Sequence, residues 1–138
     1  MTRTNRSVRA LVAAALPALL LCGCGGADSG DSSGPSAEAL KTDATAYANA
    51  LADHDYPAAY QTRSARCRLT LNQDDFAASM GQKYDGRDLH TKPAEITVTT
   101  SGETGQVTTK NFDAKASEDN PKPVKWSFID GKWQFDNC

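Results

Sequence analysis

Residues 124–137 read VKWSFIDGKWQFDN and hold the clearest structural signal in the sequence. It contains two short runs rich in aromatic and β-branched residues, separated by Asp130 and Gly131. An Asp-Gly pair between two alternating apolar runs is a strong local signal for a hairpin with a type I′ turn. The stretch therefore predicts two antiparallel strands joined by a two-residue loop.

The register of this hairpin divides its side chains between an aromatic face and a polar face. A two-residue loop places aromatic residues opposite one another on one face, namely Trp126 with Phe135 and Phe128 with Trp133. The other face carries polar pairs, Lys125 with Asp136 and Ser127 with Gln134. We expect the aromatic face to be buried under helices and the polar face to be solvated, as in an antiparallel sheet covered on one side.

The aromatic face has two interpretations. Such a cluster is most often hydrophobic core, and the alternative is a wall that binds a small apolar ligand. The candidate ligand wall comprises Trp126, Phe128, Trp133 and Phe135, together with Tyr47 from a predicted helix.

The residues before the hairpin predict two more strands. Ile96 and Val98 alternate with threonines, and residues 102–105 predict a turn into a strand that starts at Gln106. Val107 and Phe112 have opposite parity along that strand. Both can face inward only if a bulge intervenes, so we expect a bulge near Lys110 and a bend in the sheet.

The first part of the domain predicts helices. Ser36 is a good N-cap for a helix with apolar residues at helical spacing, Leu40, Ala44, Tyr47 and Leu51. A second, short helix is predicted from Pro57 to about Ala65, and a third after Asn72 with Phe76, Met80 and Tyr84 turned inward. The expected fold class is α+β, with N-terminal helices packed on one face of a bent antiparallel sheet.

The N-terminal sequence predicts a secretory leader. Three arginines precede the uncharged run ALVAAALPALLL, residues 10–21, which is too short to span a bilayer as a mature helix. The next residues, LCGC, resemble the bacterial lipobox, which implies that Cys24 is acylated and becomes the first residue of the mature chain once residues 1–23 are removed. The alternative is an ordinary cleaved signal followed by free secretion.

The predicted cleavage defines the partners and the location. Residues 24–35 would form a lipidated cysteine and a flexible tether, and residues 36–138 a single domain. The mature chain would hold 12 basic and 17 acidic residues, a net charge of −5, which disfavours nucleic acid as a partner. We expect anchoring in the lipid bilayer through Cys24, on the outer face of the cytoplasmic membrane, as a monomer or a homodimer.

Two cysteines remain in the predicted mature domain, Cys67 and Cys138. Outside the cytoplasm two such thiols in a small domain usually form a disulfide. The alternative is a free nucleophilic thiol at Cys67, which is flanked by Arg66 and Arg68. By strict alternation Cys138 falls on the polar face, so a disulfide requires the last strand to end or twist by Asn137.

The order of three helices and then a sheet that ends in W-x-F…D-G-x-W-x-F resembles the nuclear-transport-factor-2-like superfamily. In particular it resembles small secreted lipoproteins of actinobacteria with a cystatin- or SnoaL-like domain. The matching stretches are DHDYPAAYQTRSARCR, NQDDFAASM and FIDGKWQFDNC, and the resemblance covers nearly all of residues 36–138. It implies a cone-shaped α+β domain, a fold that serves carriers, isomerases, dehydratases and interaction modules alike.

No catalytic, cofactor or metal site is assigned from the sequence. If the domain were an enzyme, the resemblance implies an acid or base in the cone, for which the candidates are Tyr47, Asp53, His54, Asp55, Tyr56, Asp88 and His90. None of these lies in a recognisable catalytic motif. The arginines Arg63, Arg66 and Arg68 either favour a helix C-terminus or bind an anionic ligand or acidic partner.

The sequence thus favours a membrane-anchored, non-catalytic binding module whose partner is an unidentified envelope protein. The first alternative is a carrier of a small apolar ligand in the cone. The second is an isomerase- or dehydratase-like enzyme. A carrier needs an open apolar cavity, an enzyme needs that cavity with a buried ionisable pair, and an interaction module can have a filled core.

Overall fold

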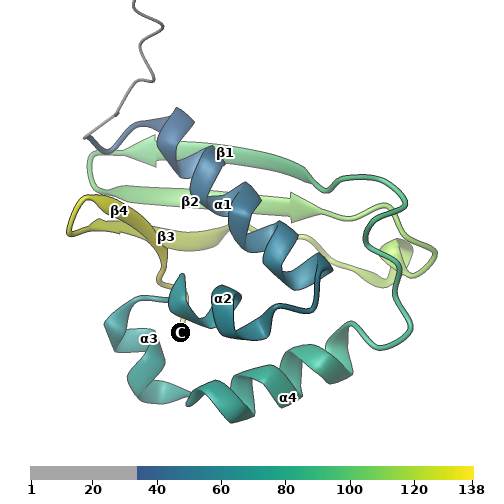
Figure 1. Cartoon of the computed structure of the whole chain (residues 1–138). Helices are drawn as coiled ribbons and strands as arrows, with labels where there is room; N and C mark the ends of the chain where they lie inside the picture. Colours follow the sequence, from purple (N-terminus) through teal and green to yellow (C-terminus); the bar gives the residue numbers. More distant parts are fainter. Residues whose placement is uncertain (1–33) are drawn as a thin grey trace, which may run out of the picture.

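The structure, a computed structural model, describes residues 34–138. Within this part the chain is α+β, with four α-helices followed by a four-stranded antiparallel sheet in the order β1-β2-β3-β4 (Figure 1). The predicted fold class is confirmed at this level. The predicted leader, the acylation site Cys24 and the tether as far as residue 33 lie outside the described residues.

The C-terminal hairpin is formed by β3 (Val124–Ile129) and β4 (Lys132–Phe135) in the predicted register. Trp126 pairs with Phe135, and Phe128 pairs with Trp133. The loop residues Asp130 and Gly131 have φ of 51° and 77°. Positive φ at both central positions is the requirement of a type I′ turn, and Gly131 meets it without steric cost.

The other hairpin is formed by β1 (Glu95–Ser101) and β2 (Thr104–Lys110). The expected bulge is wrong, because the two strands pair residue by residue from Glu95 with Lys110 to Ser101 with Thr104. The parity conflict between Val107 and Phe112 disappears because β2 ends at Lys110. Phe112 lies in the following loop, where its direction is independent of the strand alternation.

Helix α1 (Ala37–Ala52) lies across the aromatic face of the sheet (Figure 1). Ser36 caps it as predicted, with its side-chain oxygen accepting a hydrogen bond from the Ala39 backbone N–H. The core under the helix contains the buried residues Leu40, Ala44, Ile96, Val107, Trp126 and Trp133. The helix approaches β2 so closely at Gly105 that a Cβ there would collide with Leu40.

The predicted second helix ends earlier than expected, as α2 (Tyr56–Gln61), and a further helix that was not predicted, α3 (Ala65–Thr70), follows it. The break occurs because the intervening backbone bonds to β4: Phe135 N–H donates to Thr62 O, and Ser64 N–H donates to Phe135 O. Helix α4 (Gln73–Lys83) starts at the predicted cap Asn72. It packs on α2 around a second buried cluster, Leu51, Ala59, Tyr60, Phe76 and Tyr84.

Two side chains connect the sheet core to the helical cluster. Tyr47 packs against both, with its ring stacked on Phe135 and edge-on to Trp126. The Arg63 guanidinium lies between the rings of Phe76 and Phe135, 5.2 and 5.1 Å from their centroids. These contacts join the two cores into one hydrophobic interior.

Candidate functional site

The five residues of the candidate ligand wall lie inside the domain. Trp126 and Trp133 are 1% and 2% exposed, whereas Tyr47, Phe128 and Phe135 are partly buried. The aromatic rings contact one another in edge-on and stacked pairs with centroids 5.4–6.1 Å apart. None of these five residues lines either of the two surface cavities of the domain. The five aromatic side chains are therefore arranged as packed core.

Two buried donors within this interior have no hydrogen-bond partner among residues 34–138. They are Arg63 Nε and Trp126 Nε1. Arg63 as a whole is 7% exposed and is stabilised by its two aromatic neighbours. Burial raises the pKa of the Tyr47 hydroxyl to about 12, so this group is neutral at physiological pH. The interior therefore contains two hydrogen-bond donors, from Arg63 and Trp126, and the neutral hydroxyl group of Tyr47.

Arg87 organises the loops at the end of the sheet where β1 begins and β2 ends. Its guanidinium donates to both carboxylate oxygens of Asp113, at 2.9 and 2.6 Å, and to both of Asp119, at 2.9 and 2.8 Å. The Arg87 and Asp113 side chains are 4% and 2% exposed. These hydrogen bonds hold the pKa of each carboxyl below its usual range. We call this group the Arg87 clamp.

The clamp supports an accessible cavity of about 460 Å³ in the loop after β2. The cavity, here called the loop pocket, is lined by Lys110, Asn111, Phe112, Ala116, Ser117, Asp119 and Pro121. Two lysines converge on its aromatic side: Lys92 Nζ lies 3.6 Å and Lys110 Nζ 5.3 Å from the centre of the Phe112 ring. The wall of the loop pocket thus combines apolar side chains with the exposed ammonium group of Lys110 and the carboxylate of Asp119, and Lys92 contacts the Phe112 ring from outside the wall residues.

A second, smaller cavity of about 100 Å³ shares one wall residue, Asn111, with the loop pocket. Its walls come from the C-terminal half of α1 and from the segment before β1, and they include Ala48, Ala52, Leu89 and Ala94. His90 lines this cavity, and its Nε2 is 3.4 Å from Asp53 Oδ1. Both side chains of this pair are more than half exposed, at 64% and 61%.

The remaining acid–base candidates form local contacts. His54 Nδ1 lies 2.7 Å from the Tyr56 hydroxyl on the surface, and Asp55 caps α2. Asp88 accepts hydrogen bonds from the Thr91 side chain and the His90 backbone, and these bonds lower its pKa. The structure therefore brings together Asp53 with His90 and His54 with Tyr56. It places Tyr47 apart from both pairs, in the interior.

The arginine cluster predicted from the sequence is dispersed. Arg63 is buried between two rings, and Arg68 donates to the carbonyl oxygens of Gln61 and Arg63, at the end of α2. Arg66 donates to the Asp136 carboxylate at 3.0 Å and to the Asp136 backbone oxygen at 3.0 Å. Each arginine thus has an intramolecular role, and Arg68 follows the expected preference of cations for a helix C-terminus.

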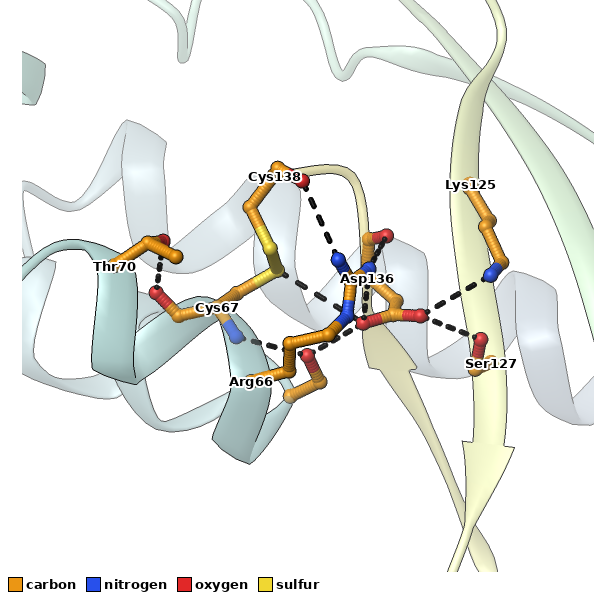
Figure 2. Close-up of polar contacts among 8 residues, drawn as sticks. Arg66, Cys67, Thr70, Lys125, Ser127, Asp136 and Cys138 are labelled. Carbon is orange, nitrogen blue, oxygen red and sulfur yellow. Dashed lines mark hydrogen bonds and ion pairs between the residues drawn. A yellow bond between two sulfur atoms is a disulfide. The ribbon is translucent and has the colours of Figure 1, made fainter.

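Asp136 is the centre of a polar network that the sequence did not reveal (Figure 2). Its carboxylate accepts hydrogen bonds from Ser64 Oγ at 2.6 Å and Ser127 Oγ at 2.9 Å, and Lys125 Nζ lies at 3.4 Å. The expectation that this face of the hairpin is solvated is wrong at Asp136, which is 7% exposed. The start of α3 covers it. Burial acts to raise the pKa of Asp136, but the hydrogen bonds outweigh burial and lower it to about 2.

Cys67 and Cys138 form the predicted disulfide beside this network (Figure 2). β4 ends at Phe135, which frees the last residues to turn toward α3 as required. Cys67, Asp136 and Cys138 also bring three ligand-type atoms within 4.8 Å of one another. Two of these atoms are the bonded sulfurs, so the grouping is explained by the disulfide and its neighbouring carboxylate.

Comparisons of this chain with protein-family models, with curated proteins and with solved structures each found no match. Among residues 34–138, no helix is both long enough and apolar enough to cross a bilayer.

Proposed function

We propose that this chain is an extracytoplasmic lipoprotein whose nuclear-transport-factor-2-like domain is a non-catalytic interaction module of the cell envelope. The basic start, the apolar run and the LCGC sequence support acylation at Cys24. A disulfide in a domain of this size supports an oxidising location. Helices over one face of an antiparallel sheet are compatible with the proposed superfamily.

Acylation is tested by the distribution of the full chain between membrane and soluble fractions. Cys24→Ala should release the protein from the membrane, because a diacylglyceryl group needs the thiol. Cys22→Ala is the matched control, since it removes a neighbouring thiol that does not follow the lipobox order, and it should remain in the membrane fraction. Retention of Cys24→Ala would refute the anchor.

The filled interior beneath α1 is the main observation in favour of an interaction module. The aromatic residues that could have lined a ligand cavity pack against one another, with Trp126 and Trp133 almost completely buried. Close packing of these rings leaves little room for a ligand and so favours an interaction module, which can have a filled core.

The loop pocket is the contact surface that we favour. It is open, it is held in place by the Arg87 clamp, and it presents Lys92 and Lys110 around an aromatic ring. This combination suits a protein segment that places a carboxylate beside an apolar side chain.

A photo-crosslinking residue at Ser117, an exposed wall residue of the loop pocket, tests this surface in intact cells. We expect a covalent adduct with an envelope protein, and its loss when Lys92→Glu and Lys110→Glu are introduced together. The matched control carries the same crosslinker at Gln106, which is exposed on the outer face of the sheet. No adduct at 117, or the same adduct from both positions, would contradict the proposal.

The carrier remains a second candidate because of one observation. Arg63 Nε and Trp126 Nε1 are buried donors without partners among residues 34–138, and such groups are costly unless something accepts their hydrogen bonds. A bound molecule with a hydrogen-bond acceptor would satisfy them. Native mass spectrometry of the full chain carrying Cys24→Ala distinguishes the candidates: an added mass that disappears on denaturation favours the carrier, and a bare oxidised chain favours the interaction module.

A further inference from the structure

The outer edge of β1 is unpaired within the described part of the chain. The sheet order places β1 at one end, where it pairs with β2 alone, and Figure 1 shows it at the rim of the sheet. Its sequence, EITVTTS, contains no proline or lysine and has one charged residue, Glu95, at its first position, and its pairing with β2 has no bulge. Natural proteins use those devices to block exposed edges, because free backbone groups template further pairing.

The opposite edge of the sheet is protected. β4 is only four residues long, and residues 62–64 lie alongside it as a parallel bridge. Phe135 N–H donates to Thr62 O at 3.0 Å, and Ser64 N–H donates to Phe135 O at 2.9 Å. Within residues 34–138 the short β4 edge is thus covered, whereas the long, regular edge of β1 is open to further pairing.

The direction of the backbone groups of β1 follows from the tight loop between β1 and β2. Ser101 and Thr104 flank a two-residue loop, so they exchange both hydrogen bonds, and bonding then alternates along the strand. Glu95, Thr97, Thr99 and Ser101 therefore bond to β2. The N–H and C=O groups of Ile96, Val98 and Thr100 point to the free edge.

We propose that β1 pairs antiparallel with β1 of a second copy of this chain, about a two-fold axis that passes between the two Val98 residues. In this register the outward N–H and C=O groups of Val98 lie opposite those of Val98 in the second copy. The outward groups of Ile96 lie opposite those of Thr100 in the second copy. Every outward donor of these three residues then faces an outward acceptor, and the two sheets become continuous.

The side chains agree with the same register. Thr97 and Thr99, both exposed on the outer face, come to lie opposite Thr99 and Thr97 of the second copy, where hydroxyl groups can hydrogen-bond. The charged residue of the strand, Glu95, faces Ser101, so no like charges meet. Half-buried Val98 gains an apolar neighbour at the seam. Such an isologous contact closes as a dimer, because the β4 edge is already covered.

Charge patterning at the two exposed threonines tests this register. Thr97→Lys with Thr99→Lys places lysine opposite lysine twice across the proposed seam, so it should convert the dimer to monomer. Thr97→Lys with Thr99→Glu places lysine opposite glutamate twice and should keep the dimer. Both variants alter only exposed side chains, and unchanged thermal unfolding of the domain confirms that each is folded.

The measurement is light scattering on the full chain carrying Cys24→Ala, which removes the predicted acyl group, over protein concentrations from about 1 to 100 μM. We expect twice the chain mass for the parent and the Lys/Glu variant, and at least about tenfold weaker association for the Lys/Lys variant. A parent that stays monomeric, a larger oligomer, or equal association of the two variants would overturn the proposal. The inference does not depend on the proposed membrane anchor.

Discussion

Ser64 Oγ donates a hydrogen bond of 2.6 Å to Asp136 Oδ1, linking two residues that are 72 positions apart. The same hydroxyl oxygen accepts a hydrogen bond from the Cys67 backbone N–H at 3.2 Å and so caps α3. One side chain therefore fixes the start of a helix, a buried carboxylate and the position of the disulfide. The hairpin and the helices are held together here by polar groups as well as by the hydrophobic core.

Asp136→Asn should lower the free energy of unfolding by about 2 kcal/mol at pH 7, because the amide loses the charge-assisted bonds of the network. The pKa of Asp136 in the folded protein, about 2, is below its ordinary value of 3.8. The ionised carboxylate therefore contributes its full stabilisation to the folded protein at pH values above the ordinary pKa. This stabilisation is lost as the pH falls from about 4 toward 2.

Urea unfolding of parent and variant at pH 7 and pH 3 measures this dependence. The stability difference between them should narrow at pH 3. Asp130→Asn is the control, since it removes a carboxylate at an exposed turn position that asparagine also favours, and it should change stability little. Equal pH dependence of the parent and Asp136→Asn would contradict the role of the carboxylate.

Replacing both disulfide cysteines, Cys67→Ala with Cys138→Ala, should lower the free energy of unfolding by up to about 4 kcal/mol. The disulfide joins residues 71 positions apart, so it restricts the unfolded chain strongly. Guanidinium unfolding with and without a reductant measures the effect. The parent should lose stability in the reductant and the double variant should not, and an insensitive parent would show that the bond does not stabilise the fold.

Local patterns were sufficient to predict much of the fold. The Asp130-Gly131 loop sets the register of β3 and β4, and Ser36 and Asn72 mark helix starts, because each signal acts within a few residues. The break between α2 and α3 could not be predicted, since it results from backbone bonds to Phe135, far along the chain. The bulge was wrongly expected because parity was extended past the end of β2.

The candidate site was less predictable because its contacts join residues that are far apart in the sequence. Arg87 lies 26 residues from Asp113 and 32 from Asp119, and in the sequence all three look like solvated loop residues. The burial of Asp136 likewise depends on α3, which packs on it from another part of the chain. A signal that could have suggested the clamp is an arginine in a loop followed by two aspartates in the next long loop, but such spacing is common without pairing.

Arg87→Lys should loosen the loops around the loop pocket. Lysine keeps the charge but cannot bond both carboxylates with a planar fork, so Asp113 or Asp119 loses its paired contact. We expect amide hydrogen exchange in residues 111–119 to accelerate by about tenfold or more. Lys122→Ala, an exposed charge change nearby, should leave exchange unchanged. Equal protection in Arg87→Lys and the parent would show that the clamp does not order this loop.

Gly105→Ala should destabilise the protein by about 1–3 kcal/mol, because the new methyl group has no space. It would collide with Leu40 of α1 and lie 3.1 Å from the Trp133 ring, so either the helix or the indole must move. Gly81→Ala is the matched substitution in α4, where the nearest atom is Tyr56 Cε2 at 3.9 Å. It should raise stability by about 0.5–1 kcal/mol, since alanine favours the helix. Thermal unfolding of both variants measures the contrast. If Gly105→Ala is as stable as the parent, α1 does not pack on β2 as closely as described, and the filled interior that supports a surface-acting module loses its basis.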